Sequence, residues 1–384
     1  MSARGMADAC GVDFGTSNST VGWRRPGQPA LLALGDGKPT LPSAIFFHDD
    51  ENEDGASVTY GRAALADYLA GYEGRLMRSM KSLLGSSLME GHTEVRGRAL
   101  PFRTLLTHFI EELKRRAEAA AGRPFRHAVL GRPVFFVDDD PKADRLAEQT
   151  LADIAHAVGF EHIAFQYEPL AGAFHYESQI SREELVLVID VGGGTSDFSL
   201  IRLAPARAAQ AERRDDILAH GGVHVGGVDF DRQLSLASVM PALGLGTELA
   251  SGKQMPAGPY VNLASWHTIN SLYTRKSWAQ LADIRREARA KDRFDLLLKL
   301  VQQRAGHWLA MQVEQAKIAL SDAPLARIDL ARIAPGEAID VHRADFDAAI
   351  ARLVERIGAT VSTLLAQAGV AAGAVDTVFF TGGS

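Results

Sequence analysis

Residues 185–203 read LVLVIDVGGGTSDFSLIRL, and this stretch decides the fold. Five apolar residues, three of them β-branched, predict a buried strand that ends at Asp190. Three glycines follow and predict a tight turn into a returning strand at 198–203. Glycines let backbone N–H groups converge on an anion, and a neighbouring carboxylate can face the metal ion that accompanies a phosphate. The stretch predicts a phosphate-binding hairpin; the alternative is an ordinary glycine hairpin capped by Asp190.

The same pattern occurs a second time, near the start of the chain. Residues 9–24 read ACGVDFGTSNSTVGWR, which again predicts a strand, an Asp, a Gly-Thr turn and a second strand. The matching positions are Asp13 with Asp190, Gly15 with Gly194, and Thr16 with Thr195. Two copies about half a chain apart indicate two similar lobes, each offering a phosphate hairpin to a shared cleft.

Composition restricts the class of protein. The 384 residues are 46% apolar, which is typical of a globular protein with sizeable cores. No apolar run approaches the roughly 18 residues of a membrane span, and the N-terminus has no apolar signal region. The net charge of −6 argues against a nucleic-acid binder. Cys10, the single cysteine, is expected to be a small core residue. We therefore expect a cytoplasmic protein with no membrane or nucleic-acid partner.

Several helices can be placed from the spacing of apolar residues. The segment 103–121 predicts an amphipathic helix that Gly122 ends. Its inward residues are expected to be Leu106, Phe109, Ile110, Leu113 and Ala117. A helix over 141–158 is expected to turn Leu146, Ile154, Ala155 and Val158 inward. One long amphipathic helix is expected over 296–320, and 75–84 is expected to be helical or loop-like.

Six segments together resemble a known family. VDFGTSNS, EPLAGAF, IDVGGGTSDFS, VGGVDFD, EQAKIALS and VFFTGGS occur in the order typical of the nucleotide-binding domain of DnaK-type heat-shock chaperones. That domain belongs to the actin-like ATPase superfamily, and the resemblance covers nearly the whole chain. The segment ASWHTINSLYTRK is more similar to the divergent YegD-like putative chaperones.

The resemblance implies an α/β, actin-like ATPase fold: two similar lobes, a duplicated mixed-sheet domain, around a nucleotide cleft. Lobe I is expected over 1–184, with an inserted subdomain at about 42–124. Lobe II is expected over 185–384, with a mainly helical inserted subdomain at about 229–325.

The resemblance also assigns the cofactors ATP or ADP and Mg²⁺. The phosphates are expected on the backbone amides of the two hairpin turns, formed by Gly15, Thr16, Ser17, Gly192, Gly193, Gly194 and Thr195. Asp13 and Asp190 are expected to orient the water shell of Mg²⁺. The alternative for either aspartate alone is a cap at the end of a strand.

Four residues match catalytic positions of the family. They are Lys81, Glu168, Thr195 and Asp197. Lys81 is expected to reach the γ-phosphate and the attacking water, which would stabilise the transferring phosphoryl group. The alternatives are a surface lysine for Lys81, a helix cap for Glu168 and a turn hydrogen bond for Asp197.

The adenosine is expected to bind to residues of lobe II. The matching positions are Gly226, Gly227, Glu314, Lys317, Ser321, Gly382, Gly383 and Ser384. For the three helix residues the alternative is a solvated helix face. Two departures bear on base recognition: Ile318 stands where the chaperones carry an arginine, and Val228 where they carry a glutamate. His220 and His224 are interpreted as strand and turn residues rather than metal ligands.

The leading hypothesis is thus a Mg-dependent ATPase domain of a DnaK-like chaperone, in which hydrolysis opens and closes the lobes. Co-chaperones or a nucleotide-exchange partner are expected, and the resemblance implies that these 384 residues do not include the family's client-binding domain. The alternatives are an actin-like filament protein and a small-molecule kinase of the same fold. Because the family continues beyond VFFTGGS, the chain is expected to be a fragment with weakened nucleotide binding and an exposed final strand.

Overall fold

The computed structural model describes residues 9–49, 57–137, 140–207 and 214–382. The chain divides into two compact units. Unit 1 comprises Met1–Gly226 and Arg356–Ser384, and unit 2 comprises Gly227–Glu355. Among the described residues, none of the helices combines the length and the hydropathy that a membrane span needs.

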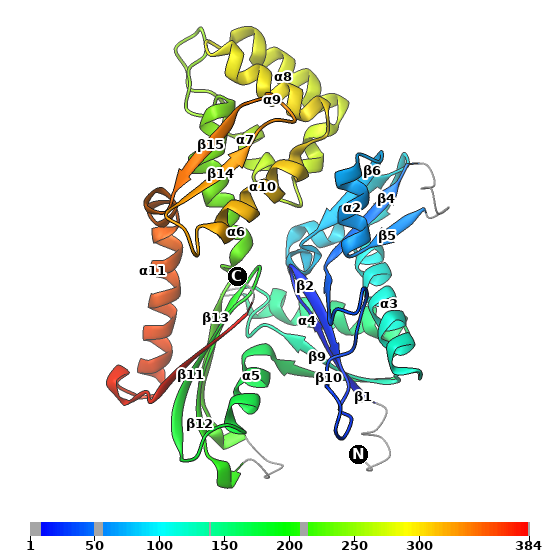
Figure 1. Ribbon diagram of the computed structural model, residues 1–384, viewed down its shortest axis with the longest axis vertical. Coiled ribbons are helices and arrows are strands. Elements are labelled where there is room, and N and C mark those ends of the chain that lie inside the picture. Colours follow the sequence, from blue (N-terminus) through cyan, green and yellow to red (C-terminus); the bar gives the residue numbers. More distant parts are fainter. Residues whose placement is uncertain (1–8, 50–56, 138–139, 208–213, 383–384) are drawn as a thin grey trace. The chain divides into compact units, whose positions relative to one another are not determined.

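The described part of unit 1 contains a five-stranded and a four-stranded mixed sheet, and four strands of the first sheet follow the same pattern as the four strands of the second (Figure 1). The first sheet runs β10 (His162–Tyr167), β9 (His127–Arg132), β1 (Ala9–Phe14), β2 (Asn18–Gly22), β3 (Thr40–Pro42). The second runs β16 (Thr377–Thr381), β11 (Glu184–Val191), β12 (Ser196–Leu203), β13 (Ile217–Val223). In each sheet an antiparallel hairpin, β1–β2 or β11–β12, has a parallel strand on one side and an antiparallel strand on the other. The predicted duplication is therefore present in the strand order as well as in the sequence.

Three helices bury the apolar faces of these sheets. Helices α3 (Phe102–Ala121) and α4 (Pro141–Ala157) share a core with β1, β2 and β9. Helix α5 (Glu168–Glu177) packs on β11 and β12. All five residues expected on the inner face of α3 are buried, and Gly122 ends that helix at a φ of 68°, as predicted. Cys10 is buried in the same core, as expected.

Smaller elements complete unit 1. The additional strands are β4 (Ala44–His48), β5 (Val58–Tyr60), β6 (Gly74–Arg78), β7 (His92–Val95) and β8 (Arg98–Pro101). The additional helices are α2 (Arg62–Ala70) and the 3-10 turns η1 (Met80–Leu83), η2 (Ser87–Glu90), η3 (Pro205–Arg207), η4 (Arg214–Asp216) and η8 (Ala372–Ala374). Residues 75–78 are thus a strand, paired with β4, and not the expected helix or loop.

Unit 2 is mainly helical, with one hairpin. Its helices are α6 (Gly227–Leu234), η5 (Ser235–Val239), η6 (Met240–Leu243), α7 (Gly258–Leu263), η7 (Ile269–Tyr273), α8 (Arg275–Glu287), α9 (Lys291–Gln302) and α10 (Gly306–Ala319). The hairpin is formed by β14 (Leu325–Asp329) and β15 (Ala338–His342). Helix α11 (Arg343–Gln367) contributes residues to both units. The core of unit 2 contains the fully buried rings of Tyr260 and Phe294.

The single helix expected over 296–320 is wrong, because the chain breaks between α9 and α10. Arg304 has a φ of 50°, which a continuing helix cannot accommodate. At Gly306 an added Cβ would lie 2.6 Å from the Tyr273 hydroxyl and 2.5 Å from a methyl group of Ile269. The second helix therefore begins where glycine permits close packing against η7.

The inward face expected for α4 is partly wrong. Leu146 is 59% exposed, whereas Ala147, Leu151, Ile154 and Ala155 are buried. The buried positions follow each other at four- and three-residue spacing, which is the period of one helix face. Leu146 lies one residue out of that pattern and so faces solvent.

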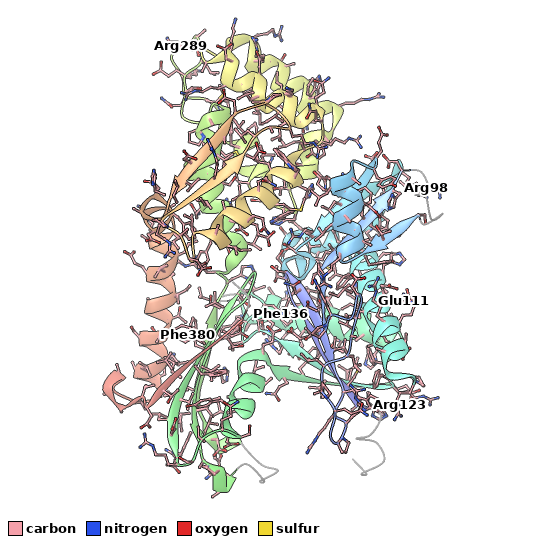
Figure 2. The ribbon with its side chains drawn as sticks, viewed as in Figure 1. Arg98, Glu111, Arg123, Phe136, Arg289 and Phe380 are labelled. Atoms are coloured by element: carbon pink, nitrogen blue, oxygen red, sulfur yellow. The ribbon has the colours of Figure 1, made fainter. Side chains whose placement is uncertain are left out.

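Strand β16 exposes apolar side chains, as expected for the final strand. Phe380, labelled in Figure 2, is 69% exposed. Val378, two residues earlier and hence on the same face, is also exposed.

The two leucines of α4, Leu146 and Leu151, provide a matched pair for testing which face of this helix is buried. Leu151→Ala is expected to lower the free energy of unfolding by about 2–5 kcal/mol, because it removes buried methyl groups and leaves a cavity. Leu146→Ala is expected to change it by less than about 0.5 kcal/mol. Urea unfolding followed by circular dichroism measures both values. Equal losses in the two variants would contradict the orientation of α4.

Candidate functional site

The two hairpin turns of unit 1 approach each other closely. A Cβ added to Gly193 would lie 2.6 Å from the Ser17 hydroxyl, and one added to Gly194 would lie 2.9 Å from the Thr16 hydroxyl. A Cβ at Gly226 would lie 2.6 Å from backbone atoms of residues 192, 193 and 194. Glycine is therefore required where these backbones meet.

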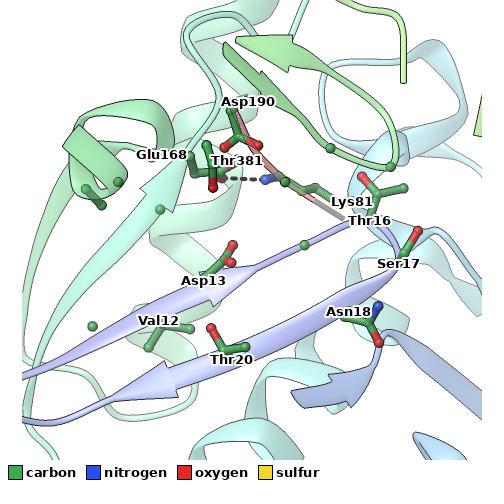
Figure 3. Close-up of a pocket in the computed structure, with 18 of the residues that line it drawn as sticks. Val12, Asp13, Thr16, Ser17, Asn18, Thr20, Lys81, Glu168, Asp190 and Thr381 are labelled. Carbon is green, nitrogen blue, oxygen red and sulfur yellow. Dashed lines mark hydrogen bonds and ion pairs between the residues drawn. The ribbon is translucent and has the colours of Figure 1, made fainter. Parts of the chain in front are cut away.

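A pocket of about 650 Å³ opens beside the turns. Its lining includes Asp13, Gly15, Thr16, Ser17, Lys81, Glu168, Asp190, Gly192, Gly193, Thr195 and Gly382. These are residues singled out from the sequence, and they come from the hairpins of both mixed sheets, from η1, from the start of α5 and from the end of β16. Figure 3 shows the side chains of Asp13, Lys81, Glu168 and Asp190 pointing toward one another in this pocket.

Lys81 is the cation of the pocket. It is the second residue of η1, a 3-10 turn that follows Ser79, whose φ is 54°. Its ammonium group is 2.5 Å from the Glu168 carboxylate, and the residue is only 6% exposed (Figure 3). Burial lowers the pKa of Lys81, but the charges of Glu168 and Asp13 outweigh that effect and raise it. The alternative of an ordinary surface lysine is wrong.

Glu168 is the first residue of α5, and its side chain is engaged beyond the helix-cap role considered as the alternative. Its carboxylate accepts the bond from Lys81, and its side chain passes close to β9. A Cβ added to Gly131 would lie 3.2 Å from the Glu168 Cγ, so this position of β9 leaves room for the glutamate.

Three aspartates surround this ion pair, and each has a raised pKa. Loss of water around the carboxyl group, followed by repulsion from Glu168, raises the pKa of Asp13 to about 6. The same two causes raise the pKa of Asp190 to about 7 and that of Asp197 to about 8. Carboxyl groups that repel one another in this way favour a bound cation.

Asp197 lies behind the pocket wall and not on it. It is 2% exposed and accepts hydrogen bonds from the Thr195 hydroxyl, at 2.9 Å, and from the Val134 backbone N–H. The turn hydrogen bond considered as the alternative role is therefore present. Sequence analysis missed Val134, and it also missed Gly222, where an added Cβ would lie 2.9 Å from the Asp197 carboxylate.

Gly382 borders Asp190 at the end of β16. Its φ is 100°, and a Cβ there would lie 2.6 Å from the Asp190 carboxylate and 2.3 Å from the Val191 carbonyl oxygen. Gly383 and Ser384 lie outside the described residues. His220, considered as a metal ligand and rejected, stacks on Tyr167 with ring centroids 5.0 Å apart.

The other residues expected at adenosine belong to unit 2 or to its boundary. Gly226 is the last residue of the first part of unit 1, and Gly227 is the first residue of unit 2. Within unit 2, Lys317 pairs with Asp231 at 2.9 Å and donates to the Gly227 carbonyl at 3.2 Å. Lys317 therefore holds α10 against the start of α6.

Three more residues that bear on the expected adenosine site lie on α10 or shortly after it: Glu314, Ile318 and Ser321. Glu314 lies within α10, and Ser321 follows its last residue. Ile318, at the position where the chaperones carry arginine, is 51% exposed on the same helix.

Comparison with known proteins places these features in a family. A family model described as "Hsp70 protein" matches residues 9–239 and 282–384. A "Chaperone protein HscA homolog" of Pseudomonas fluorescens (strain SBW25) is 30% identical over 268 residues, which cover 64% of this chain and 39% of that relative. Another, from Pseudomonas aeruginosa (strain LESB58), is 31% identical over 263 residues, with the same two shares covered.

The matched region spans about two fifths of the length of these curated relatives. Residues 240–281 lie between the two stretches that the family model matches. The closer resemblance to YegD-like putative chaperones rests on ASWHTINSLYTRK in that interval, and it stays a prediction.

The raised carboxyl pKa values predict how stability depends on pH. Between pH 4 and the raised pKa of each group, these three carboxyl groups hold more protons in the folded, metal-free chain than in the unfolded chain, so their contribution to the free energy of unfolding falls as pH rises. Each such carboxyl contributes a slope of about 1.4 kcal/mol per pH unit within its own window. Asp197→Asn is expected to make the decline shallower by about that amount up to pH 8. Urea unfolding at pH 5, 6, 7 and 8 measures the slope.

The matched control is Asp153→Asn, which changes an exposed carboxylate on α4. It is expected to leave the slope unchanged. If the free energy of unfolding fell equally steeply with pH in the wild type and in the Asp197→Asn variant, Asp197 would be ionised over the whole range from pH 5 to 8.

Proposed function

Since this chain belongs to the Hsp70 family, we propose that its acidic pocket binds ATP with Mg²⁺ and hydrolyses the terminal phosphate. The observation that carries the proposal is the Lys81–Glu168 ion pair, held among three aspartates beside two glycine turns. Glycine turns can offer backbone N–H groups to phosphate oxygens, and the buried lysine adds a cation near them.

The charge balance supports a divalent cation as part of the ligand. Asp13, Glu168, Asp190 and Asp197 bring four carboxylates, against one lysine, to the region that would receive a triphosphate. Mg²⁺ would supply positive charge here, and it commonly keeps several waters when few carboxylates hold it. Asp13 and Asp190 border the pocket at the ends of β1 and β11, so we assign them to the water shell of the ion.

The catalytic roles are assigned by position and chemistry. Lys81 would place its charge on the transferring phosphoryl group, while Glu168 would accept a hydrogen bond from the attacking water. The Thr195 hydroxyl donates its proton to Asp197, so that its oxygen presents a fixed acceptor at the pocket wall. Phosphoryl transfer depends on such positioning and on charge more than on covalent chemistry by the protein.

The remaining assignments are part of the same proposal. Glu314, Lys317, Ser321 and the glycines at 226, 227, 382 and 383, with Ser384, are assigned to adenosine. The lobes are proposed as 1–184 and 185–384, with hydrolysis driving their opening and closing. The relatives' name supports a chaperone role. Co-chaperones or an exchange partner and a cytoplasmic location are part of the same proposal. No observation favours the filament or kinase alternatives.

Melting experiments test binding. Mg²⁺-ATP or Mg²⁺-ADP is expected to stabilise the chain by about 2.7 kcal/mol at a hundredfold excess over the dissociation constant. Asp190→Ala is expected to weaken the Mg²⁺-dependent part of this gain, because Asp190 borders the pocket. Thermal unfolding with nucleotide, in Mg²⁺ and in EDTA, measures both. No stabilisation at millimolar nucleotide would count against the proposal.

A lysine variant separates chemistry from binding. Lys81→Ala is expected to slow hydrolysis by ~10² or more, the scale of losing one electrostatic stabiliser, with nucleotide affinity nearly intact. The matched control is Lys142→Ala, which removes an exposed lysine of α4. Phosphate release under single-turnover conditions gives the rate, and nucleotide titration gives the affinity. Unimpaired turnover in Lys81→Ala would overturn the catalytic assignment.

A further inference from the structure

Arg132 is a buried arginine next to the site that neither the motifs nor the proposed function use. It is the last residue of β9 and is 8% exposed. Its guanidinium group donates to five acceptor atoms in unit 1, at the Pro133, Val134, Asp144 and Glu148 positions. A buried guanidinium with this many partners is fixed in one orientation.

Two carboxylates hold the far side of the guanidinium group. The two Asp144 oxygens accept from Nη2 at 3.1 and 3.0 Å, and Glu148 accepts from Nη1. Both acids lie in α4, whose start is fixed because Asp140 caps it and Pro141 occupies its first turn. The helix thus supplies a rigid anchor for Arg132.

Two aromatic rings confine the same group. The Arg132 Cζ lies 5.2 Å from the ring centroid of Phe136 and 5.3 Å from that of Tyr167. Phe136, labelled in Figure 2, is buried, and its N–H donates to Asp144. These contacts leave the guanidinium little freedom to move away from β9.

The near side of the guanidinium group holds the backbone of Pro133 and Val134. Nε donates to the Pro133 carbonyl oxygen at 2.9 Å, and the N–H of that same peptide, on Val134, donates to Asp197. Because a trans peptide is planar, its N–H points opposite to its C=O. Nη2 also donates to the Val134 carbonyl at 3.0 Å, which fixes the next peptide.

We infer that Arg132 is a positioning residue: by clamping the Pro133–Val134 peptide it directs the Val134 N–H at the Asp197 carboxylate and so holds Asp197 and Thr195 in place. The chain from anchor to site is continuous: α4 carboxylates, Arg132, one peptide, Asp197 and the Thr195 hydroxyl. Gly222 of β13 closes the other side, since an added Cβ there would meet both Asp197 and Val134.

The inference rests on the proposed function for its catalytic consequence, but not for its geometry. A lysine can keep a positive charge beside Asp144 and Glu148, yet it cannot reproduce the planar fork that holds two carbonyl groups and two acids. Arg132→Lys therefore separates charge from positioning. Arg132→Met removes both.

Hydrogen exchange at the Val134 amide, followed by NMR in the ligand-free chain, measures the clamp directly. We expect slow exchange in the wild type and at least tenfold faster exchange in Arg132→Lys, because its hydrogen bond to Asp197 is then no longer fixed. The matched control is Arg116→Met, which removes a half-buried arginine that also bonds a carboxylate and a carbonyl, of Glu112 and Leu34, away from the pocket. It is expected to leave Val134 exchange unchanged.

ATP turnover by the same variants measures the catalytic consequence. Arg132→Lys is expected to lower kcat by about tenfold to a hundredfold, as for small misplacements of a catalytic group, with KM for ATP changed less than about twofold. If a general loss of stability were the cause, kcat would fall by a similar factor in Arg116→Met and in Arg132→Lys.

The outcomes distinguish the two proposals. Val134 exchange that is equally slow in the wild type and in Arg132→Lys would overturn the inference, whatever the turnover. Absence of ATP hydrolysis by the wild type would count against the proposed function, while Val134 exchange would still decide whether Arg132 is the clamp. Should Arg132→Met fail to fold, Arg132→Lys, which retains the charge, carries the test.

Discussion

The buried ammonium group of Lys81 is the constraint on which the site depends. Four carboxylates converge on a small region of unit 1, and the Lys81–Glu168 pair is where their repulsion is partly offset. A buried ion pair contributes little net stability, but removing one partner leaves a costly unpaired charge. The raised pKa values of Asp13, Asp190 and Asp197 mean that the metal-free chain offsets the remaining repulsion by binding protons, which a cationic ligand would replace.

The duplicated sheets explain how the carboxylates come together. Asp13 and Asp190 occupy equivalent places near the ends of β1 and β11, and each pairs across its hairpin with a residue of the returning strand. In the first hairpin that partner is Thr20, whereas in the second it is Asp197. The two hairpins share their geometry but not their chemistry. The second hairpin carries an additional acid, Asp197, which accepts a hydrogen bond from the Thr195 hydroxyl.

The sequence predicts the hairpins and the pocket lining well, because both are local. A strand, an Asp and a glycine turn are read from adjacent residues, and Asp13, Asp190 and their glycines all line one pocket. The predicted inner face of α4 is wrong at Leu146. This residue is apolar, but it lies one position away from the buried face of the helix and is exposed to solvent. The break at Arg304 was missed because it depends on the packing of Gly306 against η7.

The roles of Arg132 and Val134 could not be predicted from the sequence either, because they too depend on tertiary contacts. Arg132 precedes a proline in an apolar segment, and nothing adjacent marks it as the partner of acids in α4. Val134 contributes only its backbone N–H, which any residue except proline carries. A signal was available in Asp144 and Glu148, two acids at helical spacing that follow the arginine closely, but their side chains are more often solvated.

The parallel pairing of β16 with β11 has a consequence for how the protein folds. Leu185 donates its N–H to the carboxylate of Asp376, 191 residues away, where the two strands begin to pair. During synthesis, one edge of β11 therefore stays without its native neighbour while unit 2 is made, and strands of this kind pair slowly because a long loop must close first. An unpaired apolar edge is also a template for the wrong neighbour. Until β16 is made, the second sheet therefore keeps an open edge at β11, which is the kind of surface at which aggregation of partly folded chains begins.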